Sequence, residues 1–191
     1  KEDTLLKYEN EIDRLTKKQN NSIESQKQNI QKQLNSSDYL TKQLQEQIKL
    51  EDSRNSLVKA SSDYQIGLLE LSKRTTGDAE KRAKIDLKIA ETKQKSLLES
   101  QVLEINSIKN NEAINRAALE REKIQLSLNK LELDRSRISA EAELRKAKLN
   151  KLDQASIKAL QLQLQAINGQ YRELQKSEGL INTQISNQAE I

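Results

Sequence analysis

Residues 114–152 read INRAALEREKIQLSLNKLELDRSRISAEAELRKAKLNKL, and the apolar residues of this stretch recur every three or four positions. Nine of the twelve positions at this spacing are apolar, and the other three are Arg121, Arg135 and Arg145. Such a repeat predicts a helix that buries one stripe, or seam, in a coiled coil. The apolar members are Ile114, Ala117, Ile124, Leu128, Leu131, Ile138, Ala142, Leu149 and Leu152.

The same spacing resumes after Leu152 with one extra residue. The step to Ile157 takes five residues instead of four, which predicts a register shift near 153–156 that locally relaxes a left-handed supercoil. We therefore expect residues 76–191 to form one long amphipathic coiled-coil helix. The second part of the seam is Ile157, Leu160, Leu164, Ile167, Tyr171, Leu174, Ile181 and Ile185, with Glu178 as its polar member.

The composition also favours long helices. The 191 residues contain no Pro, Phe or Trp and only four Gly, whereas disordered chains are enriched in Pro. Residues 1–75 have a weaker heptad pattern, although Leu50, Leu57, Tyr64 and Leu71 recur every seven residues. We expect this part to be a polar, loosely patterned helix. The expected fold class is all-α, with long helices in a coiled coil or helical bundle.

The clearest interruption is residues 74–78, RTTGD. Gly77 can end a helix in the left-handed conformation, and Asp78 can cap the following helix. Thr76, Gly77 and Asp78 are therefore the expected turn and cap. The chain either folds back here as a helical hairpin or continues as one kinked rod, and the sequence leaves both arrangements open.

A helix of this length must bury its apolar stripe, so we expect several copies to associate along the seam. A second stripe suggests more than two helices around the axis, and a homo-oligomer with three or more copies is favoured over a dimer. The pattern fixes neither the number of helices nor their relative direction. The second stripe is Leu119, Leu126, Leu133, Ala140 and Ala147.

The chain lacks the residues on which most catalytic and metal-binding chemistry depends. It has no His and no Cys, so it offers no thiolate nucleophile and no zinc site of the usual type. We expect no enzymatic activity, no cofactor and no metal. The 33 basic and 29 acidic residues are interleaved, which does not predict specific nucleic-acid binding. No stretch approaches about 20 apolar residues, so no membrane span is expected within this fragment.

Some residues of the helices have both a functional and a structural interpretation. The seam arginines have two interpretations. They form a buried ladder that binds anions, or their side chains extend from a loosely packed seam into water. The second interpretation is favoured, because polar residues at core positions of coiled coils are known to tune the register. The tyrosines are not interleaved with basic clusters, so packing at core edges is expected rather than stacking on bases. These tyrosines are Tyr8, Tyr39, Tyr64 and Tyr171.

Residues 71–91, LSKRTTGDAEKRAKIDLKIAE, resemble a segment common in bacteriophage tail tape measure proteins, in which a Thr-Gly-Asp turn separates two helices. Thr76, Gly77 and Asp78 carry the match. The resemblance implies a central coiled-coil fragment of a longer virion protein, with several copies in the tail-tube lumen. It also implies a function in setting tail length, expulsion before DNA ejection, and tail-tube or baseplate proteins as partners.

Two other classes of protein fit the same pattern. One is the coiled-coil hairpin of a periplasmic export adaptor, which would be flanked by β-rich lipoyl and barrel segments. The other is a cytoskeletal or chromosome-organising coiled coil. Outside the tape measure interpretation, the sequence predicts no particular localisation.

Overall fold

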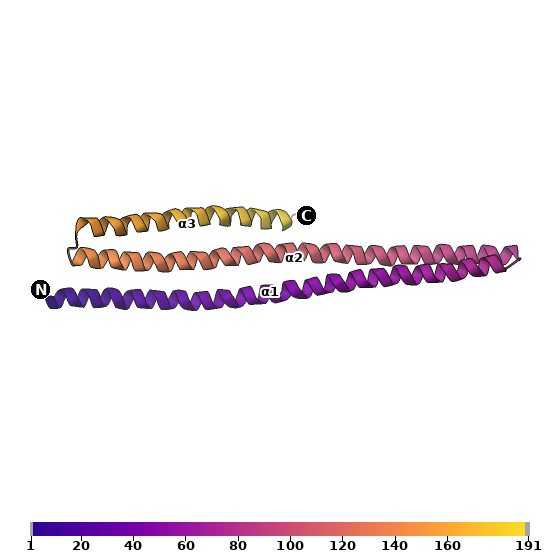
Figure 1. The fold of residues 1–191 in the computed structure, drawn as a ribbon, viewed down its shortest axis with the longest axis horizontal. Helices are drawn as coiled ribbons and strands as arrows, with labels where there is room; N and C mark the ends of the chain where they lie inside the picture. The colour runs from indigo at the N-terminus through magenta and orange to yellow at the C-terminus, as the bar shows by residue number, and fades with distance from the viewer. Residues whose placement is uncertain (1, 190–191) are drawn as a thin grey trace. The chain divides into compact units, whose positions relative to one another are not determined.

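The computed structural model describes residues 2–189 as three helices, α1 (Glu2–Thr75), α2 (Ala79–Leu149) and α3 (Gln154–Ala189) (Figure 1). No strand occurs among these residues, which confirms the expected all-α fold. The chain divides into two compact units. Unit 1 comprises Lys1–Asp38 and Arg116–Ile191, and unit 2 comprises Tyr39–Asn115. This division differs from the expected one at residue 75, because α1 and α2 each contribute to both units.

Residues 76–78 reverse the chain and make unit 2 a helical hairpin. The backbone N–H groups of Glu80 and Lys81 donate to Asp78 Oδ1 at 2.9 and 3.4 Å, so Asp78 caps the start of α2. Lys73 and Asp86 form an ion pair of 2.5 Å between the arms. The expectation of a left-handed Gly77 is wrong, because no glycine in the described residues has a positive φ. The turn therefore depends on the Asp78 cap rather than on glycine geometry.

A second reversal at residues 150–153 separates α2 from α3, so the expectation of one helix over 76–191 is also wrong. Lys151 has a φ of 50°, the left-handed value usually adopted by glycine at a helix end. Its N–H donates to the carbonyl of Lys148 at 3.3 Å, and the N–H of Leu152 donates to the carbonyl of Ala147 at 3.0 Å. This is a Schellman motif. The extra residue before Ile157 belongs to a chain reversal, not to a register shift.

The start of α3 is capped in the same manner as the start of α2. The backbone N–H of Ser156 donates to Asp153 Oδ1 at 2.8 Å. A hydrogen bond from the Ser156 side chain, and then this backbone hydrogen bond, lower the pKa of Asp153 below its ordinary value. Leu152 lies in the link between the helices and is exposed, which explains why it does not join the seam.

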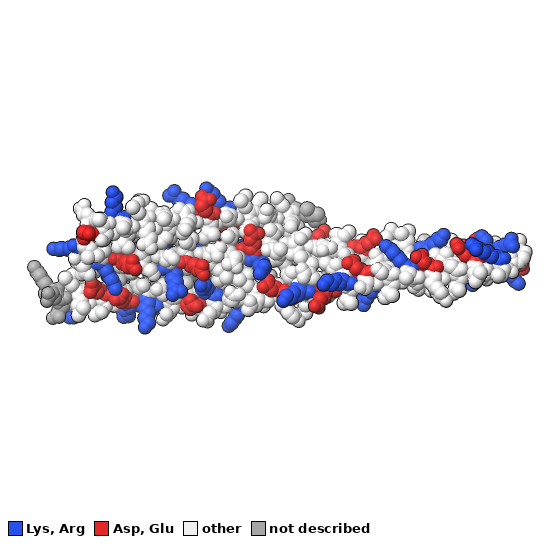
Figure 2. Space-filling model, viewed as in Figure 1, with Lys and Arg blue, Asp and Glu red and all other residues white. Residues whose placement is uncertain are grey.

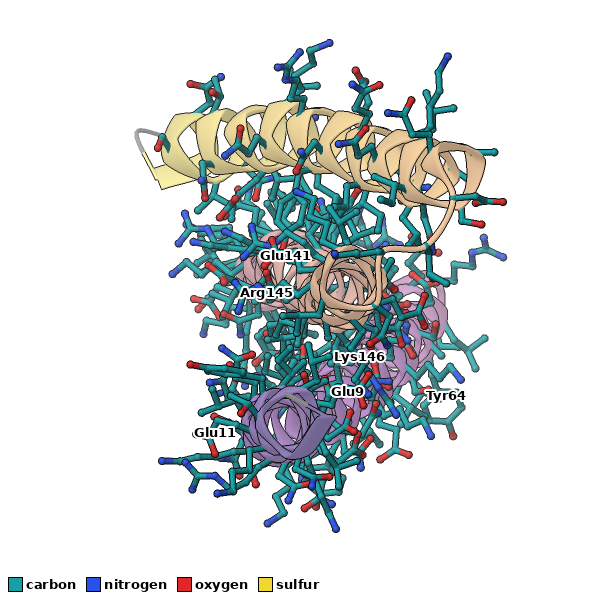
Figure 3. The ribbon with its side chains drawn as sticks, turned by 90° about the vertical axis from the view of Figure 1, so that its left-hand side faces the viewer. Glu9, Glu11, Tyr64, Glu141, Arg145 and Lys146 are labelled. Carbon is teal, nitrogen blue, oxygen red and sulfur yellow. The ribbon has the colours of Figure 1, made fainter. Side chains whose placement is uncertain are left out.

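Within unit 1, the end of α2 lies between α1 and α3 (Figures 1 and 3). On one side, Lys146 pairs with Asp13 of α1 at 2.5 Å, and Asn150 donates to Glu9 Oε1 at 2.5 Å. On the other side, Arg116 donates to the backbone carbonyl of Gln188 of α3 at 2.7 Å. A helix with neighbours on two sides needs two apolar stripes, which accounts for the second stripe along residues 119–147.

The core of unit 1 consists of aliphatic side chains from all three helices. Ala140 and Ala147 are the most deeply buried, each 2% exposed. Such small residues let neighbouring helices approach closely. The other buried core side chains are Ile23, Leu34, Leu128, Ile167 and Ile181.

Candidate functional site: an exposed apolar groove on the hairpin

The predicted seam lies almost entirely within unit 1. Its apolar residues from Ala117 to Leu149 and from Ile157 to Ile185 are buried or half-buried there. Ile114 is half-buried in unit 2, and Leu152 is the exposed exception. The seam was predicted as a contact between copies, but three helices of one chain are enough to cover the unit 1 part. The burial of these residues therefore needs no second copy.

The seam arginines lie at the edges of the α2 stripe and extend into water. Arg121 pairs with Asp38 at 2.8 Å, and Arg135 lies 3.9 Å from Glu24, both acids belonging to α1. Arg145 lies 4.0 Å from Glu141 on its own helix (Figure 3). All three guanidinium side chains are more than half exposed, so each exposed pair contributes at most about 1 kcal/mol. These contacts agree with the interpretation of arginines that extend from the seam.

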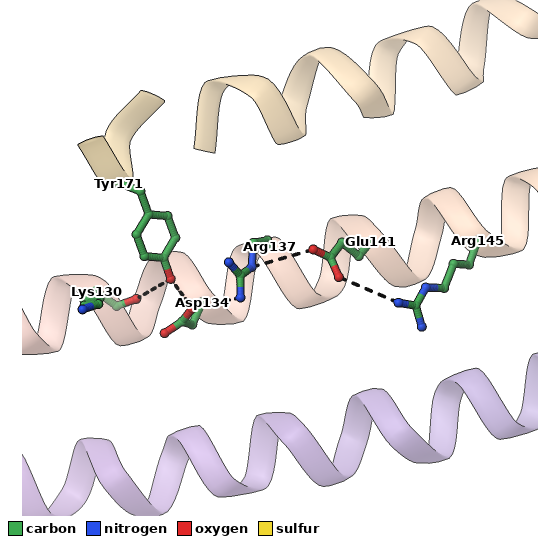
Figure 4. Close-up of polar contacts among 6 residues, drawn as sticks. All are labelled: Lys130, Asp134, Arg137, Glu141, Arg145 and Tyr171. Carbon is green, nitrogen blue, oxygen red and sulfur yellow. Dashed lines mark hydrogen bonds and ion pairs between the residues drawn. The ribbon is translucent and has the colours of Figure 1, made fainter. Parts of the chain in front are cut away.

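A polar cluster joins α3 to α2 on the other side (Figure 4). The Tyr171 hydroxyl lies 3.5 Å from the Lys130 carbonyl and donates a shorter hydrogen bond to Asp134 Oδ1. Arg137 lies over the Tyr171 ring, 5.5 Å from its centroid, and its Nε lies 3.7 Å from Glu141 Oε1. The cluster holds two helices together and shows no geometry that suggests catalysis. The other three tyrosines are exposed, so their expected packing at core edges is wrong.

The interior of unit 2 is more polar than that of unit 1. Within residues 39–115, all of which the structure describes, the two buried side chains are Ser62 and Ser100, which are 8% and 6% exposed. Aliphatic side chains of both arms, such as Ile48, Ile66 and Ile89, are only half-buried. Ser100 donates to Asn55 Oδ1 at 2.7 Å, and Asn110 Nδ2 donates to a Glu51 carboxylate oxygen at 3.1 Å. Serine and asparagine at these positions form hydrogen bonds between the arms but bury little apolar surface.

Many of the large apolar side chains of unit 2 point outward. Their exposed fractions reach 69% for Leu57 and 70% for Tyr64. On α1 they include residues 50, 57, 64 and 71, whose seven-residue spacing places them along one side of the helix. Exposed apolar side chains that form a patch of this extent are typical of interaction surfaces. The exposed apolar residues on this arm of α1 include Leu40, Leu50, Leu57, Tyr64, Leu68 and Leu71.

An open groove of about 510 Å³ lies between the two arms of the hairpin. Its walls are almost wholly apolar, and Arg54 and Glu99 contribute the charged groups at its edge. Two further hollows adjoin it, one sharing Arg54 and the other sharing Leu57 and Glu99, so the depression continues along one face. The apolar lining residues are Leu57, Val58, Leu98, Val102 and Leu103.

The groove offers shape and apolar area rather than reactive groups. The side chains described include no group of three or more acidic residues placed to hold a metal ion. None of the helices between residues 2 and 189 offers a stretch long and apolar enough to cross a bilayer. Lysines and arginines alternate with acidic residues over the visible surface of each unit (Figure 2). An open groove with apolar walls of this kind is typical of a surface that binds apolar side chains of another protein.

Comparison with known proteins gives no family. No protein-family model, no curated protein and no solved structure matches this chain.

Sequence reasoning missed the groove, although part of its signal was visible. The seven-residue recurrence of Leu50, Leu57, Tyr64 and Leu71 was visible, but residues 1–75 were predicted to be a polar, loosely patterned helix. The opposite wall comes from Leu98 and Val102, about 40 residues further along the chain. Only the reversal at 76–78 brings these walls together, and the sequence left that reversal open.

Proposed function

We propose that this chain is a structural segment that acts through helix packing, as part of a phage tail tape measure protein. The observation that carries the proposal is the Asp78-capped turn between two long helices, because the resemblance to tape measure proteins rests on residues 76–78. The exposed apolar face of unit 2 supports a function in an assembly, since such a face becomes stable by being covered. In this proposal the segment lies in the lumen of the tail tube and leaves before the DNA.

The hairpin changes how such a segment would set tail length. A helix advances about 1.5 Å per residue, so the two arms of unit 2, residues 39–75 and 79–115, each span about 55 Å. Because the arms run side by side, unit 2 adds about 55 Å if it lies along the tail axis. The same 77 residues of Tyr39–Asn115 would add about 115 Å as one continuous helix.

A deletion of unit 2 tests the proposal. In the virus that encodes the chain, residues 39–115 are replaced by a short Gly/Ser loop, and tail lengths are measured by electron microscopy. Shortening by about 55 Å supports a folded hairpin in the tail, and shortening by about 115 Å supports an extended helix. Tails of unchanged length, or purified virions without peptides of this chain by mass spectrometry, would contradict the tape measure function.

The hairpin itself favours a second candidate, the helical hairpin of a periplasmic export adaptor. The specific observation is the chain reversal between two antiparallel arms of equal length. The test is the sequence on both sides of this chain in the full gene. Lipoyl and β-barrel segments on both sides would support the adaptor, and their absence would remove it.

A further inference from the structure

The helical hairpin of unit 2 exposes many large apolar side chains, and its two buried positions are serines. In unit 1 the corresponding arms of α1 and α2 are joined by α3, which buries aliphatic side chains. Within residues 39–115 no third helix does so, and the groove at Leu57 and Leu98 stays open. We propose that the groove face of unit 2 binds the same face of a second copy of this chain, forming a four-helix bundle from two hairpins.

The apolar area of this face is sufficient for a weak dimer. Fully burying one such side chain from a fully exposed state removes roughly 60–120 Å² from water, if about 1.5–3 kcal/mol is divided by about 25 cal/mol per Å². The arm of α1 contributes the six exposed apolar residues named above, and Leu98 and Val102 add two from α2. Because these eight side chains are 51–70% exposed in the single chain, covering them removes roughly 300–600 Å² per copy, which is less than the roughly 800 Å² per partner of a standard interface.

The charges at the groove select one of the two ways in which the faces can meet. The contacts of Ser100 with Asn55 and of Asn110 with Glu51 set the register of the arms. In that register, Arg54 and Glu99 lie within about one helical turn of each other along the axis, on opposite arms. Glu99 lies 4.0 Å from Lys95 of its own helix. An exposed pair of this kind contributes at most about 1 kcal/mol, so Glu99 can exchange it for an arginine from across the interface.

A two-fold axis that runs along the helices sets α1 of one copy against α2 of the other. Arg54 of each copy then lies opposite Glu99 of the second copy, and Glu51 lies opposite Lys109 of the second copy, which also lines this face. An axis across the helices instead sets α1 against α1, and the two Arg54 side chains meet if that axis crosses the hairpin near residue 54. Like charges placed together oppose association, so the hairpins pair in parallel with their turns at the same end.

The affinity test uses neighbouring leucines as matched variants in the 191-residue chain. Sedimentation equilibrium is expected to give about 44 kDa, twice the 21.9 kDa of one chain. Leu98→Gln combined with Leu57→Gln should raise the dissociation constant at least about tenfold. Leu97→Gln should change it less than about twofold, because Leu97 is equally exposed but does not line the groove. Circular dichroism at 222 nm checks that each variant stays helical.

A charge exchange and a single cysteine test the orientation. Arg54→Glu should weaken the dimer about tenfold, and adding Glu99→Arg should restore most of the affinity. Because the chain has no cysteine, Gly77→Cys introduces a single thiol at the turn, where a Cβ meets no atom within 4 Å. Parallel hairpins place the two thiols close enough to oxidise to a disulfide dimer.

Three results would overturn the inference. They are a 21.9 kDa species at all concentrations, equal weakening by the Leu97 and Leu98 substitutions, and a dimer that the groove variants leave intact. Absence of the disulfide in a dimer that the groove variants do weaken would overturn the parallel arrangement. The inference does not depend on the tape measure proposal, because these measurements need only the purified chain.

Discussion

The hydroxyl of Tyr171 on α3 donates a hydrogen bond to Oδ1 of Asp134 on α2 (Figure 4). Partial burial of the phenol, and then this hydrogen bond to a carboxylate, raise the pKa of Tyr171 to about 12. The nearby Arg137 acts in the opposite direction and lowers it. Tyr171 thus links two helices of unit 1, and the pKa of its hydroxyl depends on the contact between them.

Tyr171→Phe should remove a pH dependence at alkaline pH. With an unfolded pKa near 10 and a folded pKa of about 12, the native state retains the phenol proton after the unfolded state has lost it. The contribution to stability is therefore complete below about pH 10 and is lost as the pH rises towards 12. In urea unfolding between pH 8 and 12, the free energy of unfolding should fall less with rising pH for the variant than for the parent chain. The same pH dependence of the unfolding free energy in both proteins would contradict the attribution of this dependence to Tyr171.

Lys151→Gly should stabilise unit 1 by about 1 kcal/mol. Lys151 has a φ of 50°, and a residue with a Cβ in this region costs about 1–2 kcal/mol, whereas glycine adopts it without penalty. Lys148→Gly is the matched control, since it lies within α2 and should cost about 1 kcal/mol. Urea unfolding at neutral pH measures both. Destabilisation by both substitutions would show that the helix end does not need the left-handed residue.

Gly77→Ala should have an effect that the sequence alone would not suggest. Gly77 has no positive φ, and a Cβ there meets no atom within 4 Å. Alanine therefore reduces the freedom of the unfolded chain without strain, and the substitution should stabilise by about 0.4–1 kcal/mol. Asp78→Ala is the contrasting variant, because loss of the cap should cost about 1 kcal/mol. Thermal unfolding followed by circular dichroism distinguishes the two directions.

Asp153→Asn should reduce the acid sensitivity of the α2–α3 link. Hydrogen bonds from the side chain and backbone of Ser156 lower the pKa of Asp153, so its contribution to stability is present above about pH 4 and is lost as the pH falls further. Asparagine accepts the same backbone hydrogen bond without titrating. Unfolding between pH 2 and 5 should therefore be less steep for this variant, and Asp153→Ala should be destabilised throughout. A variant as acid-sensitive as the parent chain would refute the role of this cap.

The sequence predicted features that depend on neighbouring residues. The seam from Ala117 to Leu149 follows from helical spacing alone, and the Asp78 cap follows from one side chain and the two N–H groups after it. The reversal at 150–153 could not be predicted in this way. A five-residue step fits either a skip in a continuous helix or a turn, and Lys151 lacks the glycine signal of a left-handed helix end.

The other features that the sequence did not predict depend on contacts between segments that are distant in the chain. The second stripe at Ala140 and Ala147 was recognised as a second contact, but the spacing does not say whether another copy or α3 covers it. The groove requires Leu57 and Leu98 to lie on one face, which depends on the register of two arms. That register is set by polar contacts such as Ser100 with Asn55, and heptad patterns give no information on them.

Ala140→Leu should destabilise unit 1, because no room is left around this position. Ala140 is 2% exposed, and added methylene groups in a packed interface typically cost about 1–3 kcal/mol through shifted side chains and backbone. The control is Ala118→Leu, an exposed position on α2 where the change should stay within about 0.5 kcal/mol. Urea unfolding of both variants compares the sites. Equal stability would mean that the helices around Ala140 can separate, in which case the small residues of the second stripe do not set their spacing.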